Sequence, residues 1–350
     1  MRMTRRGFAG GAGLALAGAM LPAHARSMIS LGEAHPIAWL DPELRPSARE
    51  LLANSAKTPP LSDLTVADRR KAGAASVAAS LPDITIAEQK VPGGAGQPPV
   101  TVFAINVRAG SRRPAILHTH GGGHVLGQAR NELRFLQELA RDLDCVIVSV
   151  EYRLAPETRF TGSVEDNYAA LRWLHGNADA LGVDRRRIAL LGESAGGTHA
   201  ALLAIAARDR GEVPLVLQAL IYPMLDDRTG STRRVPPHIG RILWTEESNR
   251  YGWSSFLGVA AGGPNVPAAG VPARVASLEG LAPAFIAVGG ADLFVSEDIE
   301  YARRLTEANV ATELLVVPRA YHAFDRIAPE TEVARRFREA ELGAFRRAFA

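Results

Sequence analysis

Ser194 combines a nucleophilic hydroxyl with small neighbours. The residues GESAGG occupy positions 192–197, directly after the apolar run Ile188–Leu191 and at the start of an alanine-rich helical pattern. A nucleophile on a sharp turn between a strand and a helix needs small neighbours, because the backbone is strained and the hydroxyl must stand clear of it. The spacing G-x-S-x-G alone is weak, but its place after a predicted strand indicates that Ser194 is a nucleophile.

A second glycine-rich segment is suited to stabilising negative charge on oxygen. The residues HTHGGGH occupy positions 118–124, beginning in the last two residues of the predicted strand Ala115–Thr119. A tetrahedral oxyanion needs two or three converging N–H donors, and consecutive glycines let the main chain come that close. We therefore expect Gly122 and Gly123 to form an oxyanion hole together with the N–H group of Ala195.

The same segment admits a competing interpretation as a metal site. His118, His120 and His124 have the spacing H-x-H-x-x-x-H, and strand alternation would turn the first two to one face. Some metallo-hydrolases use a similar run with Asp before the last histidine, but position 123 is glycine. Since no nearby carboxylate completes a ligand set, we expect no metal here.

A serine hydroxyl is a poor nucleophile near neutral pH, so Ser194 needs a general base. In strand–nucleophile–helix folds of this kind, the histidine follows the nucleophile and the acid along the chain. Beyond His199 the chain has only two histidines, His238 and His322. His238 lies in a Pro-Pro-His run outside the sheet pattern, whereas His322 follows the last predicted strand. His322 is therefore the predicted base.

The base in turn needs an acid that orients its imidazole. Asp292 follows the predicted strand Ala284–Val288 and precedes His322 by 30 residues. Asp226 and Asp227 follow the strand before it and remain competitors. We choose Asp292 as the acid of a Ser-His-Asp triad.

Two further carboxylates are weaker candidates for that role. Glu297 and Asp298 come directly after Ser296, a combination that indicates the first turn of a helix capped by the serine side chain. We expect Ser296 to be that N-cap and the two acids to be helix-start charges.

The remaining pattern indicates an α/β fold with a mostly parallel central sheet flanked by helices. Short β-branched runs alternate with helical periodicity, which is typical of βαβ units. Strands are predicted at Val100–Val107, Ala115–Thr119, Cys145–Val150, Ile188–Leu191, Val216–Ile221, Ala284–Val288 and Glu313–Val317. Helices are predicted at Glu132–Asp142, Val164–Leu181, Ala195–Arg208, Glu297–Ala308 and Glu332–Phe349.

Two stretches fit this alternation poorly. Residues 27–80 are helical in pattern without a strand, and residues 225–280 hold several aromatic residues among many Gly and Pro. Either could cover the carboxyl ends of the strands, where open α/β sheets bind ligands. The predicted organisation is a signal peptide at 1–25, the N-terminal part of a helical cap at 26–80, the core at 81–224, a cap insertion at 225–280, and the core again at 281–350.

Composition excludes several classes of protein. With 47% apolar and 22% charged residues the chain is ordinary globular material, not a disordered or fibrous sequence. Arg2, Arg5 and Arg6 account for the formal net charge of +3, so the body of the chain is neutral and we expect no nucleic-acid partner. Cys145 is the single cysteine, which excludes an intramolecular disulfide, and its strand-like surroundings predict a core residue.

The N-terminus is typical of an exported protein. Paired arginines at 5 and 6, an apolar stretch at 9–21 and an Ala-x-Ala end at 23–25 form the pattern of a cleaved signal peptide of the twin-arginine type. The predicted location is the periplasm, with a cytoplasmic protein as the alternative. The apolar stretch is too short and glycine-rich for a stable membrane span.

These blocks together resemble the hormone-sensitive-lipase-like branch of the α/β-hydrolase fold, the bacterial family IV esterases with an H-G-G-G segment. The resemblance begins near residue 114 and continues to the C-terminus. It rests on HGGG at 120–123, EYRLAPE at 151–157, ED at 165–166, GESAGG at 192–197, YP at 222–223, Asp292 and His322.

The resemblance implies a cofactor-independent serine carboxylesterase with a helical cap. Ser194 is then the nucleophile, Asp292 the acid and His322 the base, while His120 and Tyr152 brace the oxyanion loop. The expected partners are a small ester with a short- to medium-chain acyl group or an aryl group, and water as acyl acceptor. An acyltransferase that uses the same triad is the alternative, followed by a non-catalytic small-molecule-binding protein. The sequence predicts no oligomeric state.

Three positions depart from the family pattern. His124 replaces an aromatic or aliphatic residue after the glycines, Glu193 replaces the commoner Asp before the nucleophile, and Leu293 replaces Pro after Asp292. None of these removes a predicted catalytic group. His124 bears on the acyl pocket and therefore on the size of the accepted substrate.

Overall fold

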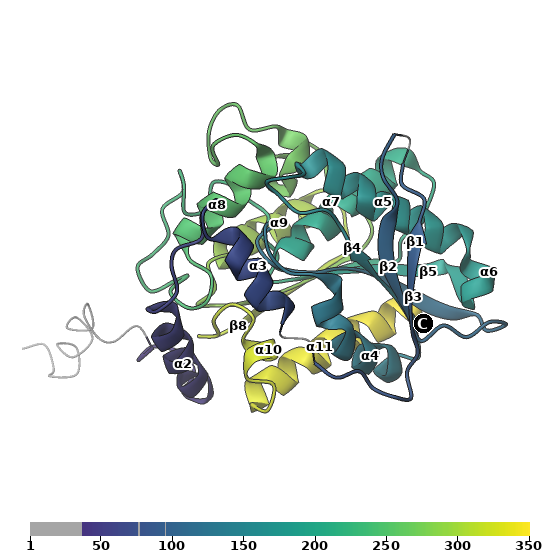
Figure 1. Cartoon of the computed structure of the whole chain (residues 1–350), viewed down its shortest axis with the longest axis horizontal. Coiled ribbons are helices and arrows are strands. Elements are labelled where there is room, and N and C mark those ends of the chain that lie inside the picture. Colours follow the sequence, from purple (N-terminus) through teal and green to yellow (C-terminus); the bar gives the residue numbers. More distant parts are fainter. Residues whose placement is uncertain (1–36, 76–77, 95) are drawn as a thin grey trace, which may run out of the picture.

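The computed structural model describes residues 37–75, 78–94 and 96–350, and the predicted signal peptide at 1–25 lies outside this part of the chain. Within the described residues the architecture is one mixed sheet between two layers of helices (Figure 1). Eight strands follow in the order β1-β2-β4-β3-β5-β6-β7-β8. β2 pairs antiparallel with both β1 and β4, and all later neighbours are parallel. This is the predicted fold class, the α/β-hydrolase fold.

The strands agree with the sequence prediction except that β5 begins five residues before the predicted Ile188–Leu191 and that one edge strand was not predicted. Their bounds are β1 Ile86–Val91, β2 Val100–Ile105, β3 Arg113–Thr119, β4 Val146–Glu151, β5 Val183–Glu193, β6 Leu217–Ile221, β7 Ala284–Gly289 and β8 Thr312–Val317. The sequence analysis missed β1, because this edge strand reads IAEQKV and buries only its last residue. It therefore lacks both the continuous apolar run of a central strand and a clear alternation.

Helices cover both faces of the sheet, as Figure 1 shows. One face carries α5 (Phe160–Gly176), α7 (Ala195–Arg210) and α9 (Val295–Glu307). The other carries α4 (Leu133–Asp142) and α11 (Glu332–Phe349). The predicted helix Val164–Leu181 is divided into α5 and the short α6 (Ala178–Leu181).

Strand alternation divides the core between these two layers. In β4, Val146, Val148 and Val150 pack into the cluster beneath α5 and α7. Ile147, between them, packs with the residues of α4 and α11 on the opposite face. Cys145 belongs to this second cluster and is fully buried, which confirms its prediction as a core residue. The sheet is thus buried on both faces and is a rigid platform for the loops at the ends of its strands.

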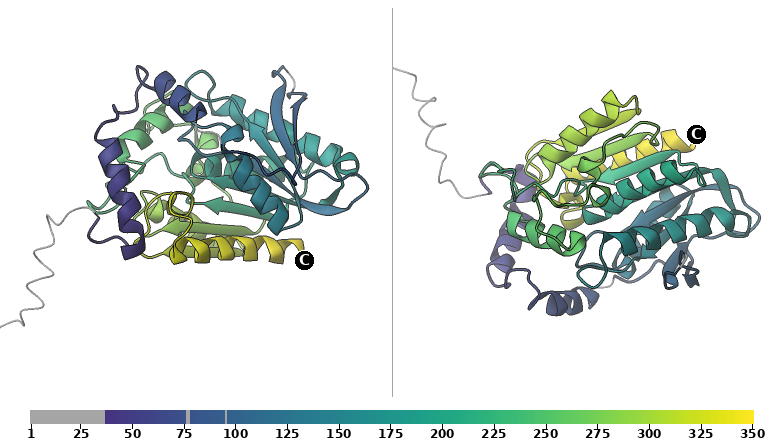
Figure 2. Two further views of the ribbon diagram at one scale, coloured as in Figure 1. Left: turned by 60° about the horizontal axis from the view of Figure 1, so that its bottom comes forward. Right: turned by 90° about the horizontal axis from the view of Figure 1, so that it is seen from above.

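Three helices outside the two layers lie at one end of the molecule. They are α2 (Arg45–Ser55), α3 (Val66–Ala74) and α8 (Glu246–Leu257), and the three views of Figures 1 and 2 place them on the same side. The Tyr251 hydroxyl of α8 donates to Asp63, just before α3. Among the described residues, no helix combines the length and apolar character needed to cross a membrane.

Candidate active site

Ser194 occupies the turn between β5 and α7. Its backbone has φ 58° and ψ −121°, a conformation that residues other than glycine rarely adopt. The turn is crowded, because a Cβ at Gly192 would lie 2.2 Å from the carbonyl oxygen of Gly196, and one at Gly196 would lie 1.9 Å from that of Thr119. The two glycines are therefore required by the close approach of these main chains, as the sequence analysis expected.

The structure brings the three predicted residues of the triad together. His322 follows β8, and its Nε2 lies 3.0 Å from Ser194 Oγ while its Nδ1 lies 2.7 Å from Asp292 Oδ2. Asp292 Oδ1 accepts a second hydrogen bond, from the N–H of Phe294 at 3.0 Å. Ser194, Asp292 and His322 are exposed by 8%, 1% and 5%, so the hydrogen bonds between them are shielded from bulk water.

The start of α9 corrects one prediction. The helix begins at Val295, so Ser296 lies inside it and Phe294 occupies the N-cap position without a side-chain cap. The carboxylate of Asp292 instead receives the Phe294 N–H group. Glu297 and Asp298 are in the first turn as predicted, but both are buried. Burial is the largest cause that raises the pKa of each well above its usual range.

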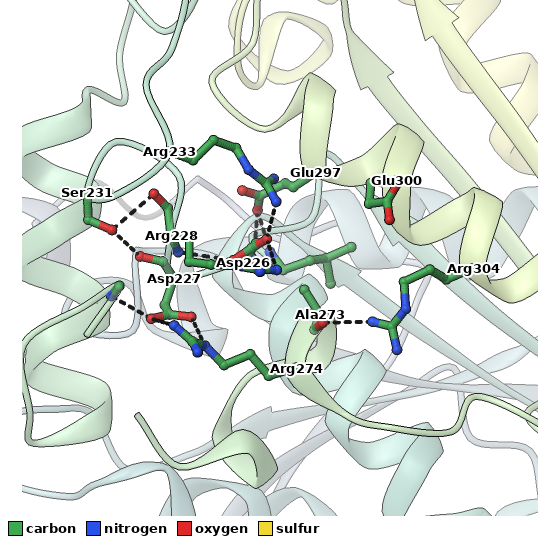
Figure 3. Close-up of polar contacts among 12 residues, drawn as sticks. Asp226, Asp227, Arg228, Ser231, Arg233, Ala273, Arg274, Glu297, Glu300 and Arg304 are labelled. Atoms are coloured by element: carbon green, nitrogen blue, oxygen red, sulfur yellow. Dashed lines mark hydrogen bonds and ion pairs between the residues drawn. The ribbon is translucent and has the colours of Figure 1, made fainter. Parts of the chain in front are cut away.

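The competing acids Asp226 and Asp227 lie in a separate network after β6, shown in Figure 3. Asp226 accepts from Arg228 Nε at 2.8 Å and pairs with Arg233 Nη2 at 2.8 Å. Asp227 pairs with Arg274 Nε at 2.6 Å. These contacts hold residues 226–274 to one another, and neither carboxylate contacts His322. Asp226 and Asp227 therefore form ion pairs with arginines outside the triad and do not orient His322.

Glu297 ties this network to the loop that carries Asp292. From the first turn of α9, its Oε1 accepts from the N–H of Leu225 at 2.6 Å and of Asp226 at 3.1 Å. A cavity of about 540 Å³ lies beside the network, next to Glu297 and Arg304, and does not reach Ser194. Arg304 itself donates to the carbonyl oxygen of Ala273 at 2.7 Å (Figure 3).

The three predicted oxyanion donors lie close to Ser194. Gly122 and Gly123 line the same cavity as Ser194, and Ala195 is the first residue of α7. Within the described residues, the N–H groups of Gly122, Gly123 and Ala195 have no hydrogen-bond acceptor. Unpaired backbone donors of this kind are available to a ligand oxygen.

Trp244 restricts the conformation of the glycine segment. Gly123 has φ +59°, and a Cβ there would lie 2.0 Å from the Trp244 ring. Gly122 has φ +127°, and its carbonyl oxygen accepts from the N–H groups of Val125 and Leu126. The segment is therefore a tight turn fixed by an aromatic residue from the stretch between β6 and β7.

A buried aromatic cluster supports the turn from behind. The Tyr152 hydroxyl donates to the carbonyl oxygen of His120 at 2.6 Å, and the two rings stack at 4.2 Å. His124 stacks on Phe256 of α8 at 3.9 Å, with His199 at its edge. Burial lowers the pKa of His120 to about 4 and that of His124 to about 3. These imidazoles are consequently neutral packing groups near neutral pH.

His118 has different neighbours from the other two histidines of its segment. Its Nδ1 lies 2.8 Å from Ser149 Oγ and its Nε2 lies 2.9 Å from Glu193 Oε2. Burial opposes ionisation of Glu193, yet the attraction and hydrogen bond of His118 hold the pKa of this carboxyl below its usual value. Glu193, one of the departures from the family pattern, is thus a buried hydrogen-bond partner of His118 immediately before the nucleophile.

A cavity of about 320 Å³ lies beside Ser194. Leu243 and Trp244 give it an apolar wall, while Glu132 and Arg326 give it a charged one. Leu243 and Trp244 belong to the predicted cap insertion 225–280, whereas the sequence analysis missed Glu132 and Arg326. Glu132 and Arg326 are 194 positions apart and form an ion pair at 2.6 Å, and no local spacing could have revealed this contact.

Comparisons with known proteins agree with this geometry. The family model described as alpha/beta hydrolase fold matches residues 116–326. Esterase LipI of Mycobacterium tuberculosis is 37% identical over 205 residues, 57% of this chain and 62% of that protein. The match thus spans less than two thirds of LipI. Carboxylesterase NlhH of the same organism is 34% identical over 280 residues, 77% of this chain and 84% of that protein.

Solved structures give the same result over most of the chain. A bacterial heroin esterase superposes with a TM-score of 0.80 at 33% sequence identity, covering 90% of this chain and 100% of that one. The match therefore extends beyond the motifs to the sheet and to the helices around it. The chain belongs to the alpha/beta hydrolase fold family, in the hormone-sensitive-lipase-like branch that its motifs predicted.

Proposed function

We propose that this protein is a serine carboxylic-ester hydrolase. One observation carries the proposal: Ser194 Oγ, His322 Nε2, His322 Nδ1 and Asp292 Oδ2 form a continuous hydrogen-bonded chain, with distances of 3.0 and 2.7 Å, at the wall of a cavity. This is the arrangement that activates a serine hydroxyl. Relatives whose names include esterase LipI and carboxylesterase NlhH support the same reaction class.

The reaction proceeds through an acyl-enzyme. Ser194 Oγ attacks the ester carbonyl carbon while His322 Nε2 takes the hydroxyl proton, and Asp292 stabilises the resulting imidazolium. The carbonyl oxygen, now negative, accepts from the free N–H groups of Gly122, Gly123 and Ala195. The tetrahedral intermediate collapses as His322 gives its proton to the leaving alcohol. Water then attacks the acyl carbon while His322 Nε2 takes one of its protons. As the bond from the acyl carbon to Ser194 Oγ breaks, His322 returns that proton to Ser194 Oγ and the carboxylic acid leaves.

The cavity favours short- to medium-chain acyl or aryl esters. Its volume of about 320 Å³ is at the small end of ligand pockets, which span roughly 300–1,000 Å³. We further propose that residues 26–80, of which 26–36 and 76–77 lie outside the described part of the chain, and residues 225–280 act as the cap. Trp244 against Gly123, and the Arg70 hydrogen bond to the Val125 carbonyl oxygen at 2.7 Å, support this role.

A rate series on 4-nitrophenyl esters tests the activity. We expect kcat/KM to be highest between the acetate and the hexanoate and to fall for the dodecanoate. Ser194→Ala should lower turnover by roughly 10⁴–10⁶-fold, as in other triads. The control is Ser163→Ala, which removes another buried hydroxyl, and it should be active. A Ser194→Ala protein with a tenth of the wild-type rate, or a maximum at the dodecanoate, would contradict the proposal. Product analysis with added alcohol would distinguish hydrolysis from acyl transfer.

We also propose that the chain is exported through its first 25 residues. The support is the sequence pattern alone, with paired arginines at 5 and 6 before an apolar stretch. Replacing both arginines by lysine should retain the protein in the cytoplasm with an uncleaved N-terminus. Equal amounts of wild-type and variant protein in the periplasmic fraction would contradict this proposal.

A further inference from the structure

The cavity beside Ser194 has a charged wall that the proposed reaction does not use. Arg326 lies on α10 (Phe324–Ile327), four positions after His322, and Glu132 ends the short 3-10 helix Ala129–Glu132. Arg326 Nη2 lies 2.6 Å from Glu132 Oε2, and both side chains line the cavity. An apolar acyl chain would gain no binding free energy from such a wall, because it would remove water from the ion pair without replacing the lost hydrogen bonds.

Arg326 has N–H donors that lack an acceptor in the described part of the chain. A guanidinium carries several N–H groups in a fixed plane. Across the part of the chain that the structure describes, the only acceptor for the Arg326 side chain is Glu132. Its other nitrogens are not enclosed by protein, and the side chain is 27% exposed. Because Arg326 lines the cavity, these donors are open to a ligand held there.

The guanidinium is also held in place. Its Cζ lies 3.5 Å from the centroid of the Phe135 ring, and Glu132 fixes one edge of its plane. Phe135 carries a second arginine, Arg338, whose Cζ lies 4.5 Å from the same centroid. Arg338 does not line the cavity. A rigid guanidinium loses little entropy when it binds, so the site is preorganised for an acceptor.

The surrounding charges select the kind of acceptor. Glu132 already balances the charge of Arg326, and Glu193 adds a carboxylate to the cavity wall. A carboxylate on the substrate would be repelled by both Glu132 and Glu193. An uncharged carbonyl or hydroxyl oxygen would accept from the free N–H donors of Arg326 without this repulsion. We propose that Arg326 is a specificity-determining residue that binds an uncharged oxygen-bearing substituent of the ester, away from the scissile bond. This inference rests on the proposed function.

Matched esters that differ by one oxygen test the inference. On the acyl side, 4-nitrophenyl 5-oxohexanoate is compared with 4-nitrophenyl 5-methylhexanoate, which replaces the ketone oxygen by a methyl group. On the alcohol side, 5-acetoxypentan-2-one is compared with 4-methylpentyl acetate by pH-stat. A hydrogen bond to a charged donor predicts a ketone preference of roughly tenfold in kcat/KM, in at least one of the two series.

Variants assign the preference to a residue. Arg326→Met should reduce the ketone preference to about onefold while hydrolysing the alkyl ester within about threefold of the wild-type rate, which also reports that it folds. The matched control Arg338→Met removes the other arginine on the Phe135 ring and should keep the preference. If Arg326→Met does not fold, Arg326→Lys replaces it, and a lysine that keeps the full preference would overturn the requirement for the guanidinium.

Each remaining outcome decides the question. A wild-type protein that hydrolyses both members of each pair equally overturns the assignment of Arg326 but leaves the proposed function standing. Faster hydrolysis of the 4-nitrophenyl monoester of glutaric acid than of the 5-oxohexanoate overturns the choice of an uncharged group. Equal loss of preference in both arginine variants means that Phe135 packing is the cause. A protein without Ser194-dependent hydrolysis of any ester overturns the proposed function and this inference together.

Discussion

Glu193 Oε2 lies 2.9 Å from His118 Nε2, in a buried pair immediately next to the nucleophile turn. His118 in turn contacts Ser149 Oγ on β4, so the pair connects three neighbouring strands, β4, β3 and β5. A buried carboxylate that loses its partner is strongly destabilising, because its charge is no longer compensated. This pair therefore fixes the strand end from which Ser194 projects.

Replacing His118 by Phe should destabilise the protein in a pH-dependent way. The pKa of Glu193 is held below 4.5 by His118, so the pair contributes stability above that pH and loses it as the pH falls through the folded-state pKa. Without His118, burial would instead raise this pKa. We expect a loss of about 3 kcal/mol in unfolding free energy at pH 8 and a smaller loss at pH 5, measured by urea denaturation.

The matched control is the double variant His118→Phe with Glu193→Gln. It removes the orphaned charge, so most of the extra loss at pH 8 should disappear. An equal loss at both pH values in the single variant would show that packing, not the charge of Glu193, explains the effect.

The oxyanion turn gives a second prediction. Gly123→Ala should lower kcat by about 10²–10³-fold, because its Cβ would lie 2.0 Å from the Trp244 ring and displace a proposed oxyanion donor. Initial rates on 4-nitrophenyl butanoate measure the effect. Gly110→Ala is the matched control, since Gly110 has φ +77° and a Cβ there would have no neighbour within 4 Å. Similar activities of the two variants would count against a catalytic role for the Gly123 amide.

A buried acid on α11 gives a third prediction. Burial raises the pKa of Glu341 from 4.5 to about 7, and Glu193 and Asp325 add to the effect while Arg338 opposes it. The folded protein keeps a proton that the unfolded chain has lost, so this group reduces stability as the pH rises from about 4.5 to 7. Glu341→Gln should therefore be more stable than the wild type at pH 8, by up to about 3 kcal/mol, and nearly equal to it at pH 4.5.

Urea denaturation at the two pH values measures this difference. Glu339→Gln is the control, because Glu339 is exposed on the same helix and should show no comparable pH-dependent gain. A Glu341→Gln protein that is equally or less stable than the wild type at pH 8 would mean that the carboxyl is ionised in the folded state.

The sequence predicted the fold class because its central strands carry strong signals. Runs such as Cys145–Val148, within the predicted strand Cys145–Val150, are buried on both faces and are therefore continuously apolar. The edge strand Ile86–Val91 carries no such signal, since residues 87–90 are exposed on both faces of the strand. Ser296 was wrongly expected to cap α9, because the carboxylate of Asp292 receives the Phe294 N–H instead. Local sequence does not reveal that the Asp292 side chain accepts a hydrogen bond at the start of α9.

The candidate site likewise contains residues that the sequence predicts and residues that it does not. Ser194, Asp292 and His322 could be selected because each follows a strand of a parallel sheet, and the carboxyl ends of those strands meet at one edge. The Glu132–Arg326 pair could not, because it depends on how α10 packs against the start of α4. Such contacts are set by tertiary packing between distant segments and leave no periodic pattern in the sequence.

Labelling with diethyl 4-nitrophenyl phosphate tests the central claim most directly. The reagent phosphorylates only an activated nucleophile, so peptide mass spectrometry should find one diethylphosphoryl group per chain, on Ser194. The rate of labelling should fall by at least about 10³-fold in His322→Gln, because the hydroxyl then has no base. A label on another residue, or equal rates in the two proteins, would contradict a Ser194 nucleophile activated by His322.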